Sequence, residues 1–130
     1  LDDRYATAVE TVVDALRACG AAVERGEPPE SFCPGDYSVR ATGGGKIAGI
    51  AQRVRGEAAL VAGSVTVADR ASIRGVLAAV YDALGVAFDP DSVGSVAAAG
   101  GPADPGPVRT ALEDALVNGR ERVLRDVTAL

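Results

Sequence analysis

The stretch YSVRATGGGKIAGIAQRVRGEAALVAGSVTVA, residues 37–68, decides the fold class of this chain. It divides into three runs rich in β-branched residues, at 37–42, 46–54 and 58–68, which are separated by GGG and RGE. Short runs of this kind between glycine-containing turns are typical of consecutive antiparallel strands joined by hairpins. The sequence therefore predicts an antiparallel sheet of about three strands.

An amphipathic helical pattern precedes these strands, and another follows them. Apolar residues recur at helical spacing from Asp2 to about Gly20, where the glycine is a typical stop signal. After the third run, Asp69 can cap the start of a second helix that ends at Gly85. Helices that flank a run of strands, without strict alternation, favour an α+β fold with the helices on one face of the sheet.

Segments rich in proline and glycine connect these elements. Residues 24–35 contain three prolines and two glycines, so we expect a loop there. Residues 85–107 read as a turn-rich connection that holds at most a short extended or helical piece. Pro107 can open a last helical region that runs to about Asn118 and resumes through Leu130.

Length and composition indicate a single domain over residues 1–130, because the chain suffices for one core and shows no clear boundary. The net charge of -5 argues against a nucleic-acid surface, which needs clustered basic residues. No apolar run approaches the roughly 18 residues that cross a bilayer, so we expect a cytoplasmic protein with no membrane partner. The chain starts at Leu1 and contains no methionine, which predicts a processed, trimmed or partial chain.

The segment GGGK suggests a phosphate-binding loop, but its spacing is wrong for the known types. A Walker A loop needs a glycine where this chain has Arg40 and a serine or threonine where it has Ile47. A dinucleotide fingerprint fails as well, because a strand and not a helix follows the glycines. What remains is a glycine-rich turn that brings backbone N–H groups and one ammonium together, which suits an anionic ligand.

Cys33 and Lys46, the only lysine, are the candidates for nucleophilic chemistry. A cysteine reacts as its thiolate, which a nearby cation stabilises. The chain has no histidine, so a Cys/His dyad, a Ser/His/Asp triad and a His-ligated metal site are excluded within these residues, and no metal ligand set is visible. Lys46 or an arginine such as Arg53 could activate Cys33. From spacing alone, Cys33 could equally be an ordinary loop or core residue.

The pattern FCPGDYSV, then GGGKIAGIAQR, then LVAGSVTV resembles the central signature of the biotin/lipoate protein ligase superfamily. Within it, the lipoate-protein ligases and octanoyl/lipoyl amidotransferases are the most similar. The resemblance implies a biotinyl/lipoyl transferase-like fold of the class II synthetase type, of which this chain would form the second half. It also implies that Lys46 contacts an acyl-adenylate or acyl carbonyl. In the amidotransferase branch Cys33 would form the acyl thioester, with Lys46 stabilising the thiolate.

The implied activity is transfer of a lipoyl or octanoyl group to a lysine of a carrier protein, of the lipoyl-domain or glycine-cleavage-H type. In a ligase, ATP would activate free lipoate or octanoate and Cys33 would be incidental. The first half of the family's catalytic domain has no counterpart in this chain. An alternative is therefore a non-catalytic half-domain that binds an acyl group or carrier and requires a complementary N-terminal polypeptide.

Further residues of the signature are candidates for substrate binding. These are Gly35, Asp36, Gly45, Gly49, Gln52 and Gly63. Gly35 and Asp36 can equally set the start of the first strand, and a glycine such as Gly49 inside a strand marks either a close backbone approach or a bulge. Many family members carry a polar residue or histidine directly before the glycine of the third strand, whereas this chain has Ala62.

Overall fold

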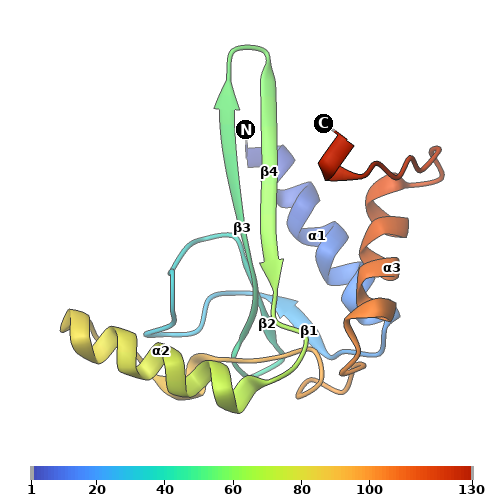
Figure 1. Ribbon diagram of the computed structural model, residues 1–130. Helices are drawn as coiled ribbons and strands as arrows, with labels where there is room; N and C mark the ends of the chain where they lie inside the picture. The colour runs from blue at the N-terminus through green and yellow to red at the C-terminus, as the bar shows by residue number, and fades with distance from the viewer. Residues whose placement is uncertain (1, 130) are drawn as a thin grey trace.

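The protein is described by a computed structural model over residues 2–129, with side chains over residues 3–128 (Figure 1). The described residues form an α+β fold with a four-stranded antiparallel sheet, so the prediction of α+β is confirmed and that of about three strands is corrected to four. The elements are α1 (Asp2–Ala18), β1 (Val23–Arg25), β2 (Ser38–Ala41), β3 (Lys46–Arg55), β4 (Ala58–Val65), α2 (Arg70–Leu84), η1 (Pro90–Ser92), α3 (Pro105–Val117) and η2 (Val127–Ala129). None of these helices is long and apolar enough to cross a membrane.

The strand that the sequence analysis missed is β1, which lies partly inside the segment expected to be a loop. The sheet order is β1-β2-β3-β4, and Val23 of β1 pairs with Ala41 of β2. Only Val23 in this three-residue strand is apolar, and its side chain is buried. Tertiary pairing and burial, rather than strand propensity, therefore determine this element.

The core lies between α1 and the first three strands. Val9 and Leu16 of α1 pack with Val39 of β2 and Ile47 of β3, and all four are fully buried. Helix α3 packs against α1 and adds Val108 to the same core. The sheet and these two helices form the two packed layers that an α+β domain requires.

The β3–β4 hairpin extends beyond this core. Its strands pair from Ala48 with Val65 to Arg55 with Ala58. Helices α1 and α3 lie on one side of the projecting hairpin, and no helix runs along its other side in the part of the chain drawn (Figure 1). The hairpin therefore carries one covered face and one open face.

Helix α2 ends as predicted, at Gly85 in the left-handed conformation with a φ of 65°. Asp69 takes the predicted N-cap position, but it has a φ of 60° and its side chain makes no capping hydrogen bond. No residue of α2 is buried. The helix is held instead by Arg70 Nε, which donates to Val93 O, and Arg74, which binds Asp91.

The C-terminal elements differ from the prediction in their limits. Helix α3 begins at Pro105 rather than Pro107 and ends at Val117, one residue before the expected Asn118. The expected resumption of the helix is not found among the described residues, where only the short turn η2 follows. Leu130, to which the prediction extended, lies outside the described residues. In the 85–107 connection, η1 precedes a single parallel bridge from Val93 to Lys46.

Candidate functional site

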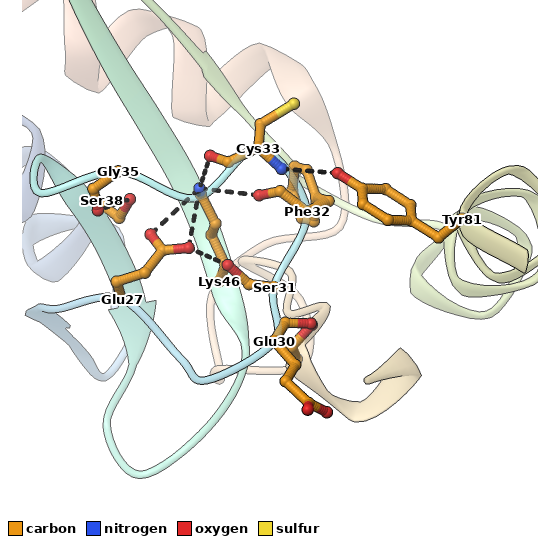
Figure 2. Close-up of polar contacts among 10 residues, drawn as sticks. Glu27, Glu30, Ser31, Phe32, Cys33, Gly35, Ser38, Lys46 and Tyr81 are labelled. Atoms are coloured by element: carbon orange, nitrogen blue, oxygen red, sulfur yellow. Dashed lines mark hydrogen bonds and ion pairs between the residues drawn. The ribbon is translucent and has the colours of Figure 1, made fainter. Parts of the chain in front are cut away.

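The ammonium group of Lys46 is buried and fully engaged. Its side chain is 2% exposed, and Nζ donates to the backbone oxygens of Cys33 at 2.8 Å and Phe32 at 3.1 Å. Glu27 supplies the counter-charge, with Oε2 3.2 Å and Oε1 3.3 Å from Nζ (Figure 2). Because a lysine ammonium has three N–H donors, these partners occupy all of them. A ligand carbonyl can reach Nζ only by replacing one of them.

Local backbone features direct Lys46 into this position. The register between β2 and β3 shifts between Val39 and Arg40. Such a bulge bends the strand and changes the direction of the side chains beside it, here at the start of β3. The 93–94 segment then crosses β3, with the N–H of Gly94 donating to Lys46 O at 2.8 Å. Lys46, Ile47 and Ala48 are therefore buried in succession, instead of alternating between core and solvent.

Cys33 lies beside Lys46, but its thiol does not face the ammonium. The residue is exposed and has a φ of 41°, which is unusual for a residue other than glycine. Its N–H donates to the Tyr81 hydroxyl at 2.9 Å, while its carbonyl accepts from Lys46. Figure 2 shows Sγ directed away from Nζ. The sequence therefore predicted the proximity of the two residues, but they contact each other through the backbone of Cys33.

A cavity of about 300 Å³ lies next to the Lys46 side chain. This is at the small end of the range of ligand pockets. Four of the predicted site residues line it together: Cys33, Gly35, Lys46 and Gly49. The Phe32 ring also lines it, with Nζ 5.1 Å from the ring centroid. The structure thus brings together half of the residues that the signature pointed to.

The other four predicted residues do not line this cavity. Gly45 and Gly63 are positions where one backbone approaches another, and Asp36 is exposed on the loop before β2. Gln52 lies on the face of β3 toward α1, where its backbone N–H donates to the Tyr5 hydroxyl at 2.6 Å. Both amide atoms of the Gln52 side chain are buried without a hydrogen-bond partner in the described part of the chain.

Sequence reasoning missed Glu27, which pairs with Lys46, and Tyr81, whose hydroxyl accepts from the Cys33 N–H. Glu27 lies in the proline-rich segment, which the sequence predicts only to be a loop. One signal was present, because a buried lysine requires a carboxylate partner and this segment contains three glutamates, Glu24, Glu27 and Glu30. Tyr81 stacks on Phe88 and binds the Cys33 N–H, which connects α2 to the loop.

No group of three or more His, Cys, Asp or Glu residues that could hold a metal ion occurs among residues 2–129. A larger groove of about 550 Å³ lies between α1, β4 and α3, but none of the predicted site residues lines it. The candidate site is therefore the cavity at Lys46. Comparison with protein-family models, curated proteins and solved structures found no match.

Proposed function

We propose that this chain forms part of an acyl-handling site that transfers a lipoyl or octanoyl group to a lysine of a carrier protein. The observation that carries the proposal is the chain's only lysine, buried beside a cavity that an exposed loop cysteine also lines. The ammonium already binds two carbonyl oxygens, at 2.8 and 3.1 Å. An acyl carbonyl has the same hydrogen-bonding chemistry and can replace one of them.

In the transferase version Cys33 is the nucleophile. Its thiolate attacks the acyl carbonyl of a thioester donor, the donor thiolate leaves, and an acyl thioester forms on Sγ. The amine of the carrier lysine then attacks this thioester, which forms an amide and releases the Cys33 thiolate. Lys46 stabilises the negative charge on the acyl oxygen in both steps. Because Sγ points away from Nζ, the 31–35 loop must rearrange for this role.

In the ligase version ATP is a substrate and the acyl group arrives as its adenylate. Lys46 then contacts the acyl-adenylate, and Cys33 plays no covalent part. The exposed thiol and the engagement of Lys46 by the Cys33 carbonyl are compatible with this version without any movement of the thiol. Carrier protein, acyl chain and a cytoplasmic location stay predictions in both versions.

Substituting Cys33→Ser distinguishes the two versions. We expect the wild-type chain, incubated with an octanoyl thioester, to gain an octanoyl group on Cys33, and the variant to gain none, because a serine hydroxyl lacks an activating base here. Mass spectrometry of the intact chain and of its peptides measures this. A Cys33→Ser protein that still acylates its carrier with ATP and free lipoate would exclude the thioester route.

A second candidate function is a non-catalytic half-domain that holds an acyl group or a carrier protein. The absence of any buried residue in α2 favours it, because this helix then offers uncovered surface to another polypeptide. If the isolated chain forms no adduct, and activity returns only when a second polypeptide is added, this version is supported. An adduct formed by the isolated chain contradicts it.

Gly49→Ala tests whether the cavity beside Lys46 is the acyl site. A methyl group there would lie 3.4 Å from Lys46 Cε and 3.7 Å from Nζ, which is ordinary contact, so the fold is retained. The methyl group would occupy the space that an acyl carbonyl needs to reach Nζ. We expect acylation to fall about tenfold or more, since displacements near 1 Å can have effects of this size, with an unchanged melting temperature.

The control for Gly49→Ala is Gly75→Ala, which adds the same methyl group in open space on α2. Acylation is followed in the assay that the wild-type chain supports, alone or with its complementary polypeptide. Full activity of the Gly49→Ala protein would place the acyl group elsewhere.

A further inference from the structure

The outer edge of β4 has no partner strand among the described residues. The sheet order ends at β4, which pairs with β3 alone. Ala58–Val65 has the sequence AALVAGSV, with no charged residue and no proline. Natural proteins usually protect an exposed edge strand with charges, prolines, bulges or a covering element. This edge carries none of these within its eight residues and is a template for another strand.

The open face of the hairpin is apolar near the core and basic near its tip. Side chains alternate along a strand, so Ala51, Arg53 and Arg55 share one face of β3 with their partners on β4. Leu60, the partner of Arg53, is 66% exposed. Helices α1 and α3 lie on the opposite side of the hairpin (Figure 1). At its core end Ala51 and Ser64 line the Lys46 cavity with Cys33, and beyond this cavity the face is uncovered in the described structure.

Arg53 and Arg55 have no carboxylate partner in the part of the chain that the structure describes, whereas most other arginines of the sheet and of α2 do. Together with Ala58, Ala59 and Leu60 they line a groove of about 320 Å³. Two unpaired guanidinium groups beside an unpaired strand edge favour a ligand that is extended and acidic at one end.

We propose that β4 binds an extended segment of another polypeptide as a fifth, antiparallel strand. The segment is uncharged along most of its length and carries carboxylates near its C-terminal end, where an antiparallel strand passes Arg53 and Arg55. Strands in this sheet are all antiparallel, which is also the commoner pairing. The inference rests on the edge and its charges, and it holds whether or not the Lys46 cavity handles an acyl group.

Two further observations bear on the identity and effect of this strand. Residues 58–68 contain no acidic side chain, so a second copy of this chain that added its own β4 would bring no carboxylate to the arginines. Ser64 of β4 lines the Lys46 cavity. A strand bound alongside β4 would therefore extend the wall of that cavity as well as the sheet.

Peptide titrations followed by nitrogen-15 NMR of the full chain test the proposal. The probe is an eight-residue peptide of alternating threonine and valine whose last two residues are glutamate, matched in length to β4. We expect shifts of the β4 amides, and binding weaker by about fivefold or more when lysines replace the glutamates, as two exposed ion pairs allow. Replacing alternate threonines by proline removes backbone donors and should abolish binding.

Charge reversal is the matched control. A chain with Arg53→Glu and Arg55→Glu should prefer the lysine peptide, while a chain with Arg120→Glu and Arg125→Glu, which has the same change in net charge, should keep the wild-type preference. Equal binding of the glutamate and lysine peptides would overturn the proposal, as would undiminished binding of the proline peptide. A wild-type chain that dimerises without peptide and protects its β4 amides from exchange would also overturn it, in favour of a second copy.

Discussion

Substituting Glu27→Gln is expected to lower the free energy of unfolding by about 3 kcal/mol, because it leaves a buried ammonium without its counter-charge. The Lys46 side chain is 2% exposed, so water cannot replace the lost carboxylate. Two backbone carbonyls still bind Nζ and limit the loss. The substitution preserves the size and shape of the side chain, so the change reports the charge.

Removing the other partner, by Lys46→Met, should cost less, about 2 kcal/mol. The Glu27 carboxylate that is then left unpaired has a route to solvent, so it loses less than the buried ammonium does. The Glu27 side chain is 21% exposed, although its Oε2 is buried. In the double variant neither charge remains without its partner. The stability lost in the double variant should therefore be smaller than the sum of the two single losses, by about 1 kcal/mol or more, as expected for residues in contact. Urea denaturation of the four proteins measures this cycle.

Glu24→Gln is the matched control for Glu27→Gln. Glu24 forms an ion pair with Arg40 at 3.9 Å, but the Glu24 side chain is 44% exposed and that of Arg40 25%, so its removal should change stability by less than about 1 kcal/mol. Equal losses for the two glutamates would contradict the buried pair. Strictly additive effects of Glu27→Gln and Lys46→Met would mean that the two side chains do not interact.

The elements that the sequence predicts well are those with strong local patterns. Helix α1 has a long apolar repeat, and the β3–β4 hairpin has two runs separated by a glycine turn, so local sequence suffices for both. Strand β1 has a single buried valine in three residues, and only its pairing with β2 makes it a strand. Asp69 is a residue type that caps helices, but its positive φ prevents the usual capping geometry.

In the candidate site, too, local patterns predict some features and tertiary contacts determine the others. Hairpin geometry was enough to place Lys46 near Cys33, because the turn at 43–45 reverses the chain at a fixed point. The direction of the thiol depends on the φ of Cys33 and on the Tyr81 hydroxyl, 48 residues away. No periodicity relates such positions, so the carbonyl contact could not be predicted. The apolar repeat of α2 likewise predicted a helix but not whether another surface covers it.

Gly45 is the second residue at which we expect a large effect, and the reason is backbone packing rather than ligand binding. A Cβ at this position would meet the backbone of the crossing segment, 2.6 Å from Gly94 N and from Val93 O. Real Cβ atoms do not approach backbone atoms this closely, so one of the two chains would have to move. That movement would disturb the Gly94 to Lys46 hydrogen bond and the bridge from Val93 to Lys46.

We therefore expect Gly45→Ala to lower the free energy of unfolding by about 3 kcal/mol, the upper end of the cost of overpacking. This is a large fraction of the 5 to 15 kcal/mol typical of small domains. Gly35→Ala is the matched control, because it adds the same methyl group where nothing lies within 4 Å. Thermal and urea denaturation of both variants measures the difference. A Gly45→Ala protein as stable as the control would mean that the 93–94 segment does not cross β3 as described, and the burial of Lys46 would then lose its structural basis.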